Sequence, residues 1–345
     1  MNSMKSHLGA REGTVVKRKH VQLTMSRSRW LAMDEFSWVW FGTLALFVVS
    51  AVIAPGTVTK GSLLAMLPFA GMLAIVATGQ TVVIQQRGLD MSAIGMVGLA
   101  GVLMAILGNA LGSQLVAALL TLVAAVLVGA LNGFLTSRLS ISPLVATLAV
   151  NALLIGFVRS LTGNAPVSTA VSLQEFSHSK FLGLPFSIIF AFLFVVVVWI
   201  ITRKTALGRR FIAVGINPAA ALAAGVRVNA YQLGAYVVSA VCFAVAGMLL
   251  AGFIGSASHT AGNDYLLPAI AAVVVGGTPF TGGKGSVVAS AVAALFMAQL
   301  GQMVLAMGAS TAIQLLVQAF AILIAISVRN IPAVINSLTR KAVSK

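Results

Sequence analysis

Ten runs of mostly apolar residues follow one another along the chain, separated by short polar connections. They lie near residues 36–54, 62–84, 91–108, 114–136, 143–162, 186–202, 230–253, 266–279, 286–305 and 311–328. A helix of about 20 apolar residues crosses the hydrocarbon core of a bilayer. Only the run 266–279 is too short for a full span, so it is expected either to span incompletely or to be re-entrant. The pattern predicts an all-α, polytopic integral membrane protein with about ten transmembrane or re-entrant helices.

Composition excludes a water-soluble protein. Apolar residues make up 59% of the 345 residues and charged residues only 8%, whereas a soluble domain carries about 25% charged residues. The single cysteine, Cys242, excludes a disulfide within the chain. Cys and His residues form no cluster with the spacing of a metal site, and no nucleophile–base constellation is found. We therefore expect a protein that is not an enzyme and that binds no metal or cofactor itself.

Lys and Arg residues gather in the connections that an even number of spans places on one side. Seven of them precede the first run, and others follow the fourth, sixth and last runs: Arg138, Arg203, Lys204, Arg209, Arg210, Arg227, Arg329, Arg340, Lys341 and Lys345. Lys60, Arg159 and Lys180 lie near the opposite side. The positive-inside rule then predicts that both termini are cytoplasmic. It also explains the net charge of +16 without a nucleic-acid partner.

The two ends of the chain differ from its middle. Residues 1–35 are predicted to form a basic cytoplasmic tail, disordered and attracted to anionic membrane lipid. Residues 36–330 form the transmembrane domain, and residues 331–345 form a second basic cytoplasmic tail. On the outer side, the connection 163–185 mixes polar residues with Leu173, Phe176 and Phe181. This spacing favours a short amphipathic helix, which either rests on the membrane or contacts a partner.

Polar residues interrupt the apolar pattern within QTVVIQQRGLDMSAIGM, residues 80–96. Polar groups at membrane depth are costly and often functional. Two interpretations remain open for this break: a plain cytoplasmic turn in which Asp90 caps the next helix, or a segment that lines the solute path. The candidates for lining a path are Gln80, Asp90, Ser92, Asn132 and Asn151. Asn and Gln within spans also hold helices together, so these residues have a structural interpretation as well.

A second break, GGTPFTGGKGS at residues 276–286, resembles a phosphate-binding loop only superficially. In the pattern G-x-x-x-x-G-K-[ST], Thr278 stands where the first glycine is required, and Gly285 stands where the hydroxyl residue is required. Gly276, Gly277, Gly282 and Gly283 are instead expected to allow sharp turns and close backbone approach. Both breaks precede an apolar helix, a similarity that is consistent with an internal repeat.

The longest predicted cytoplasmic connection covers residues 203–229. Asn217 suits a helix cap, Pro218 the first helical position and Gly225 the end of a short helix over about 217–225. A helix held between two spans is well placed to dock onto another protein. The alternative is a structured loop without a partner.

These residues together resemble the membrane-spanning permease subunits of ABC importers for monosaccharides, which are related to the branched-chain amino acid permeases. The matching blocks are Gly88–Ser92, Asn132–Gly133, Pro143–Leu148 with Arg159, Gly208–Gly225 and Ile270–Ser286. The resemblance covers roughly residues 40–330. It departs from the family around Gln299–Gln302, at Lys284, and after Tyr265. These departures leave the kind of sugar undetermined.

The resemblance implies a permease subunit in a bacterial inner membrane. Its partners would be a second copy or a paralogue, cytoplasmic ATPase subunits that bind the ATP, and a periplasmic sugar-binding protein. The residues that the resemblance places in the ATPase-coupling loop are Gly208, Arg209, Arg210, Gly215, Asn217 and Gly225. The main alternative is a secondary transporter driven by an ion gradient. Such a protein usually needs ionisable residues near the middle of the membrane, and Asp90 is the one candidate that the sequence offers.

Overall fold

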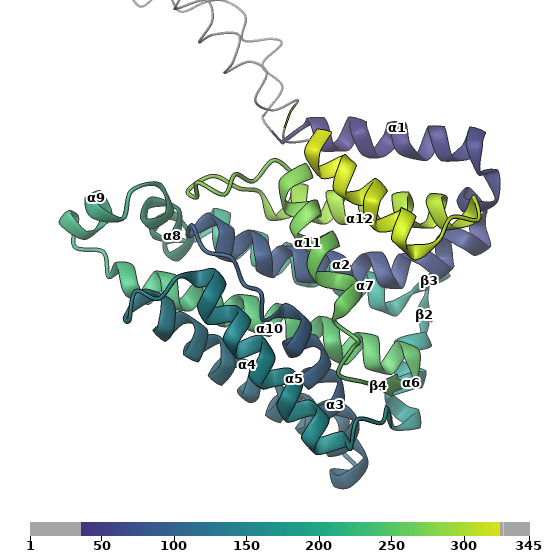
Figure 1. Ribbon diagram of the computed structural model, residues 1–345, viewed down its shortest axis with the longest axis horizontal. Coiled ribbons are helices and arrows are strands. Elements are labelled where there is room, and N and C mark those ends of the chain that lie inside the picture. Colours follow the sequence, from purple (N-terminus) through teal and green to yellow (C-terminus); the bar gives the residue numbers. More distant parts are fainter. Residues whose placement is uncertain (1–35, 325–326, 328–345) are drawn as a thin grey trace, which may run out of the picture. The chain divides into compact units, whose positions relative to one another are not determined.

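The computed structural model describes residues 36–324 and residue 327. Both predicted tails, residues 1–35 and 331–345, therefore lie outside the described residues. Within this part, each of the ten apolar runs coincides with a helix (Figure 1). The helices on these runs are α1 Trp38–Ile53, α2 Lys60–Gln85, α3 Ala93–Leu111, α4 Gln114–Ser137, α5 Pro143–Thr162, α7 Phe186–Lys204, α10 Val228–Ile254, α11 Asn263–Val275, α12 Val287–Ala306 and a last helix, Thr311–Ile324.

Seven of these helices are long and apolar enough to cross a membrane, namely α2, α3, α4, α5, α7, α10 and α12. Three apolar helices are shorter: α1, α11 and Thr311–Ile324. The 13 residues of α11 cover about 20 Å at 1.5 Å per residue, which is less than the thickness of the hydrocarbon core. The polytopic helical architecture is thus confirmed. The total of ten spanning or re-entrant helices stays a prediction.

The connections hold the remaining elements. They are the 3₁₀ turn η1 Pro55–Val58 and the helices α6 Val171–His178, α8 Ala206–Ile216 and α9 Pro218–Ala223. Four two-residue strands also occur, which the hydrophobic pattern did not predict: β1 Val167–Ser168 pairs antiparallel with β4 Ser256–Ala257, and β2 Lys180–Phe181 with β3 Leu184–Pro185. Figure 1 shows α8 and α9 at one end of the bundle and α6 with the β2–β3 hairpin at the other.

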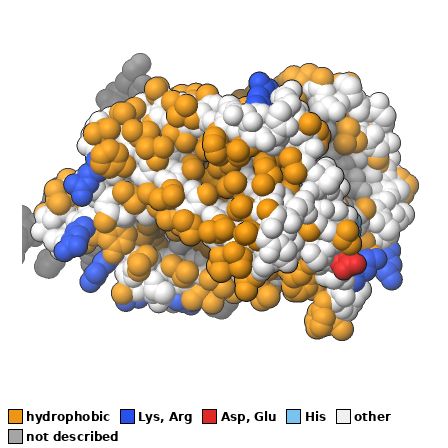
Figure 2. Space-filling view, turned by 90° about the horizontal axis from the view of Figure 1, so that it is seen from below, with side chains coloured by type: hydrophobic (Ala, Val, Ile, Leu, Met, Phe, Trp, Pro, Cys, Tyr) orange, Lys and Arg blue, Asp and Glu red, His pale blue; other side chains and the backbone are white. Residues whose placement is uncertain are grey.

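The helices separate into an inner and an outer set. In the most apolar 18-residue stretch of each helix, 61% of the residues of α2 and 67% of those of α10 are buried, whereas only 22% are buried in α4 and in α7. Apolar side chains that α4 and α7 expose, such as Leu127 and Phe192, are suited to face lipid. Figure 2 shows hydrophobic side chains over most of one face, with Lys and Arg toward its edges.

Glycines allow α4 to pack closely against α10. A Cβ atom on Gly129 would lie 2.6 Å from the Cα of Val237, and one on Gly133 would lie 2.7 Å from the Cα of Leu233. Small residues at helix contacts let backbones approach within a membrane, where packing rather than hydrophobic burial drives association.

The predicted short helix within 163–185 is present as α6. Its Leu173 is buried against Gly252 of α10, while Phe176 packs edge-to-face on Phe186 with ring centroids 4.8 Å apart. One apolar side chain of α6 therefore faces the protein. Phe181 and Leu182, in the hairpin that follows, are exposed.

Candidate functional site

The connection between α7 and α10 folds into two helices, α8 and α9, and is called here the α8–α9 loop (residues 205–227). Thr205 caps α8 by accepting a hydrogen bond from the Gly208 N–H at 3.1 Å, and Asn217 caps α9 by accepting one from the Ala220 N–H at 3.1 Å. Gly225 has a φ of 78°, a left-handed conformation that glycine adopts without strain. The predicted cap, helix and glycine stop are confirmed. The 11-residue helix α8 was not predicted.

The end of α8 contacts both polar breaks, and we call this contact the junction (residues 85–87, 215–216 and 282–285). The Gly283 N–H donates to the Gln85 carbonyl oxygen at 2.8 Å. Arg87 donates from Nε to the Gly215 carbonyl at 3.2 Å and from Nη2 to the Ile216 carbonyl at 2.6 Å. The loop between α11 and α12 is therefore bonded to the end of α2, which in turn holds the end of α8.

The glycines of the junction are explained by how close these backbones lie. A Cβ on Gly215 would collide with the Gln85 carbonyl oxygen, and one on Gly283 would lie 2.8 Å from the Cα of Ile216. A Cβ on Gly282 would collide with the side chain of Arg87. Gly282 and Gly283 also have φ values of 80° and 76°. The glycine break thus provides turns and close approach, as the sequence predicted.

The other two predicted glycines belong to the same break but lie apart from this contact. Gly277 has a φ of 88°. A Cβ on Gly276 would lie 2.9 Å from the backbone of Ser290 in α12. Gly276 therefore lets the end of α11 lie directly against α12.

Four of the five predicted path residues form one buried group, the Asp90 cluster (Gln80, Asp90, Ser92 and Asn132). The Asp90 Oδ1 accepts hydrogen bonds from the Ser92 N–H at 3.0 Å and from the Ser92 hydroxyl at 2.5 Å. Asn132 donates to the Ser92 hydroxyl oxygen at 2.9 Å, and the Gln80 side-chain amide donates to the Asp90 carbonyl oxygen at 2.5 Å. All four side chains are inaccessible to solvent. The cluster therefore fastens the break between α2 and α3 to α4.

Asn151 lies beside this group rather than in it. Its Oδ1 accepts a hydrogen bond from the Gly95 N–H at 2.7 Å, which joins α5 to the first turn of α3. Thr147, one turn earlier on α5, accepts from the Met91 N–H at 2.9 Å. Thr147 was not predicted as a polar contact of the break, although its spacing from Asn151 places both on one helix face.

Two oxygens of the Asp90 cluster, the Asn132 Oδ1 and the Asp90 Oδ2, have no hydrogen-bond partner among the described residues. The Asp90 Oδ2 accepts no hydrogen bond from the described residues, although Ser239 of α10 approaches the carboxyl group. Buried carboxylates are usually paired or fully hydrogen-bonded. Of the carboxyl groups in residues 36–324, only that of Asp90 is fully buried.

A groove of about 860 Å³ lies between α2, α10, α11, α12 and Thr311–Ile324. More than half of the residues that line it are apolar, and we call it the polar groove for the nine polar side chains among them. Its lining runs from Ser62 and Ala306, near the end of the bundle that holds α6, to Leu73 and Met297 about halfway along their helices. The polar side chains that line it are Ser62, Ser256, Ser258, Thr260, Asp264, Tyr265, Gln302, Gln314 and Gln318. None of the five predicted path residues lines this groove.

The sequence offered one signal for this groove. One departure from the family pattern, around Gln302, lies at its wall, and Tyr265, which precedes another, also lines it. Asp264, which precedes the apolar run 266–279, lies in the first turn of α11. Gln314 and Gln318 of the last helix join Asp264 and Tyr265 of α11 in this lining, which no local pattern could reveal.

Comparisons with known proteins agree with this architecture. The profile of the family described as branched-chain amino acid transport system / permease component matches residues 62–326. The ribose import permease protein of Bacillus subtilis (strain 168) is 31% identical over 296 residues, which cover 83% of this chain and 89% of that protein. The ribose import permease protein of Escherichia coli (strain K12) is 31% identical over 292 residues, or 83% of this chain and 91% of that protein.

A third relative has a different named cargo. The autoinducer 2 import system permease protein of Escherichia coli O9:H4 (strain HS) is 32% identical over 275 residues, which cover 76% of this chain and 83% of that protein. No solved structure matches the chain. The family and these relatives are transport permeases rather than enzymes, and the resemblance inferred from the sequence motifs is confirmed. The chain belongs to the family of branched-chain amino acid transport system permease components.

Proposed function

We propose that the chain is the permease subunit of an ABC importer and forms the membrane path for a monosaccharide or a sugar-like small solute. The names of the relatives, two ribose import permeases and one autoinducer 2 import permease, support this cargo class. A periplasmic binding protein delivers the solute, and separate ATPase subunits bind the ATP that drives import. A second copy of the chain, or a paralogue, completes the path in the bacterial inner membrane.

The observation that carries the proposal is an exposed apolar surface on the α8–α9 loop. Leu222 of α9 is 64% exposed and Ile216 at the end of α8 is 59% exposed, although both belong to a connection rather than to a span. The caps at Thr205 and Asn217 hold the two helices in place. Exposed leucine and isoleucine on a structured, polar-flanked loop suit docking to another protein. The ATPase subunit is the partner that we assign to this surface.

The other coupling residues support this assignment through backbone shape. A Cβ on Gly208 would collide with the carbonyl of Thr202, so glycine allows α8 to fold back directly on the end of α7. Gly215 brings α8 onto the junction, and Gly225 turns the chain into α10. Arg209 is exposed on α8 and adds positive charge to the docking face, whereas Arg210, which is also exposed, lines the space between α8 and α10.

Charge supports a cytoplasmic position for this end of the bundle. Within the described residues, Arg138, Arg209 and Arg227 lie in connections at the α8–α9 end, and Arg203 lies in the last turn of α7 beside them. The positive-inside rule assigns such connections to the cytoplasm, and both termini lie on the same side if an even number of segments crosses.

The polar groove is the part of the path that we assign to this chain. It opens toward the end opposite the α8–α9 loop and carries hydroxyl, amide and carboxylate groups, which suit the hydroxyl groups of a sugar. The Asp90 cluster would then hold the helices around the path rather than touch the solute. This role replaces, within the proposal, the direct contact considered for Gln80, Asp90, Ser92 and Asn132.

Replacing Leu222 by Glu tests the docking surface. The side chain is exposed, so the change should leave folding and membrane insertion intact. Losing a leucine that becomes buried on docking should weaken ATPase binding by about tenfold or more. Purified ATPase would be titrated onto the full-length permease in nanodiscs, and solute uptake would be measured in proteoliposomes that contain the binding protein.

Leu182→Glu is the matched control, because Leu182 is 88% exposed at the opposite end of the bundle. It should leave ATPase binding unchanged. Wild-type ATPase binding by Leu222→Glu would contradict the docking assignment. Full uptake in vesicles without ATPase would contradict the importer proposal and favour an ion-coupled transporter, for which the buried Asp90 would be the candidate carboxylate.

A further inference from the structure

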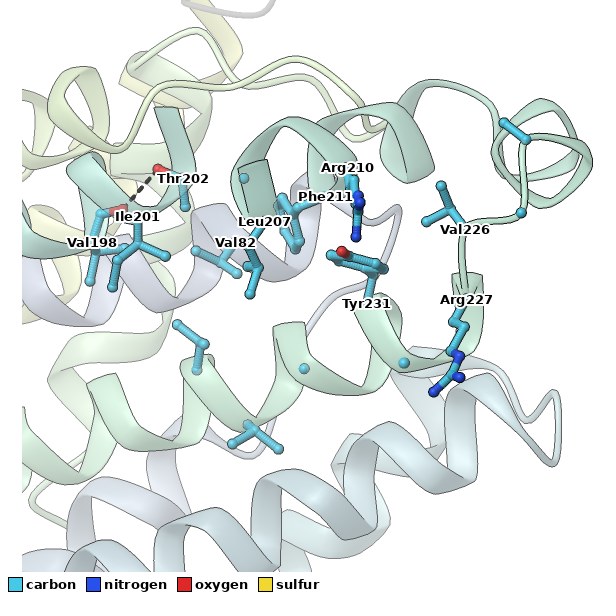
Figure 3. Close-up of a pocket in the computed structure, with 17 residues that line it drawn as sticks. Val82, Val198, Ile201, Thr202, Leu207, Arg210, Phe211, Val226, Arg227 and Tyr231 are labelled. Carbon is cyan, nitrogen blue, oxygen red and sulfur yellow. Dashed lines mark hydrogen bonds between the residues drawn. The ribbon is translucent and has the colours of Figure 1, made fainter. Parts of the chain in front are cut away.

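A cavity of about 880 Å³ lies between α7, α8 and the first half of α10, and we call it the Arg210 cavity (Figure 3). It exists because α7 and α10 hardly touch each other, while α8 packs mainly on α7. Buried Val82 of α2 and Phe211 of α8 form part of its wall. Its volume lies within the range of about 300–1,000 Å³ that is usual for small-molecule sites.

The lining changes character along the cavity. Ile201 of α7, together with Val237 and Val238 of α10, makes one part entirely aliphatic. Ile201 and Val238 are also exposed, so this part is continuous with the outer surface of two helices that are apolar enough to span a membrane. Acyl chains of a lipid can therefore enter from the side.

The opposite part of the cavity is cationic. Arg210 of α8 and Tyr231 of α10 extend toward each other there (Figure 3), and Arg227 lies at the start of α10. Acidic side chains are absent from the described residues that line it. A guanidinium binds phosphate with directed N–H groups, and a tyrosine hydroxyl at the same level adds a donor.

We propose that the Arg210 cavity binds one anionic phospholipid, whose phosphate lies beside Arg210 and Tyr231, with Arg227 as a further cation at the start of α10, and whose acyl chain lies along Ile201, Val237 and Val238. Basic pockets between transmembrane helices are suited to acidic lipid headgroups. The proposal requires only that the chain lies in a membrane, so it does not depend on the transported solute or on the ATPase.

Two features favour a lipid over a protein segment in this cavity. The aliphatic part opens toward the membrane-facing sides of α7 and α10, where lipid is the solvent, rather than toward the exposed face of α9. The cationic part lies where α10 begins, at the level at which a helix leaves the hydrocarbon and the phosphates of a bilayer lie. A phospholipid has an anionic headgroup followed by apolar acyl chains, which is the order of the cationic and aliphatic parts of the cavity.

The test measures lipid that stays bound to the purified full-length permease by native mass spectrometry, after exchange into mixed phosphatidylglycerol and phosphatidylcholine. Wild type should retain phosphatidylglycerol preferentially. Arg210→Gln should weaken that retention roughly fivefold, as expected for one cation near an acidic lipid, and Arg210→Gln combined with Arg227→Gln should weaken it further. Arg209→Gln is the matched control, because Arg209 is the neighbouring cation on α8 and does not line the cavity.

A second pair of variants tests the acyl-chain part independently of charge. Gly234 lines the cavity, and a Cβ added there would meet no atom within 4 Å. Gly234→Leu should fold and fill the space, and both lipids should then be lost. Gly156→Leu on α5 adds the same side chain at another open position outside the cavity and should retain lipid.

Equal retention of both lipids by wild type would overturn the headgroup assignment. Wild-type retention by Gly234→Leu would overturn the site. Loss of a permease dimer in Gly234→Leu, with lipid retention unchanged, would show instead that a second copy of the chain occupies the cavity.

Discussion

At the scale of single residues, Gly215 sets how closely α8 approaches the end of α2. The Gln85 carbonyl oxygen occupies the space that a Cβ would need, and this oxygen already accepts the hydrogen bond of Gly283. Moving the α2 backbone away from Gly215 would therefore break the hydrogen bond between Gln85 and Gly283. Even alanine at position 215 should therefore disturb the packing and hydrogen bonds of the whole junction.

Gly215→Ala should destabilise the protein by about 1–3 kcal/mol, the usual cost of an added group in a closely packed place. Gly156→Ala should instead stabilise the protein, because a Cβ at position 156 meets nothing within 4 Å and alanine favours the helix by up to about 1 kcal/mol. Thermal unfolding of both variants in the same detergent provides the comparison. Equal melting temperatures for the two would contradict the close approach at position 215.

The residue scale also shows what sequence reasoning could reach. Gly282 and Gly283 were singled out because glycines interrupt an apolar pattern there, and Gly215 because the family resemblance placed it in the coupling loop. Their neighbours could not be predicted, since Gln85 and Arg87 are far away in the sequence. Asp90 and Asn132 were likewise recognised as unusual. Only the structure shows that they hydrogen-bond around Ser92 away from the polar groove.

At the scale of elements, the short helix α11 provides one side of the polar groove. Its first turn carries Asp264 and Tyr265, and Pro268 follows on the same wall. Thr311–Ile324 contributes Gln314 and Gln318 from the other side. Two helices that were predicted only as apolar runs thus place polar side chains in one groove.

Asp264→Asn should lower uptake while leaving ATPase binding unchanged, because it removes a charged acceptor from the groove without removing volume. Glu175→Gln is a matched control, since Glu175 is an exposed acid on α6, at the same end of the bundle and outside the groove. Uptake by proteoliposomes at limiting solute separates the two variants. Full uptake by Asp264→Asn would remove this residue from the path.

The helix α8 marks the limit of prediction at this scale. Its sequence contains two glycines and several β-branched residues, which are weak helix formers. Tertiary contacts stabilise it instead: Phe211 is buried, and its carbonyl oxygen accepts a hydrogen bond from Gln86 at 2.8 Å. Local propensity could not indicate these contacts, whereas Asn217 and Pro218 made α9 recognisable.

At the scale of the whole molecule, the described helices give the two ends of the bundle different chemistry. The α8–α9 end carries most of the cations, whereas the other end carries the β2–β3 hairpin and the mouth of the polar groove. The distribution of Lys and Arg along the sequence predicted which end carries most of the cations, but not the hairpin or the groove. It could not predict which helices are central, because α7 and α10 are equally apolar in sequence and differ in burial.

Cysteine labelling tests the orientation directly, since the one native thiol, on Cys242, is fully buried. Leu182→Cys should react with a membrane-impermeant maleimide in intact cells, and Ala224→Cys should react only after the cells are permeabilised. Both positions are exposed in connections. Wild type measures the background, and the reverse labelling pattern would invert the proposed topology.

The junction has a mechanical consequence. Arg87 and Gly283 join the end of α8 to α2 and to the loop before α12 through hydrogen bonds to backbone carbonyl groups. A displacement of α8 should therefore be transmitted directly to α2 and α12. The end of α8, α2 and the start of α12 should then move together as a rigid unit. Any stroke delivered to α8 would move α2 and α12 as a block, and these helices carry two walls of the polar groove.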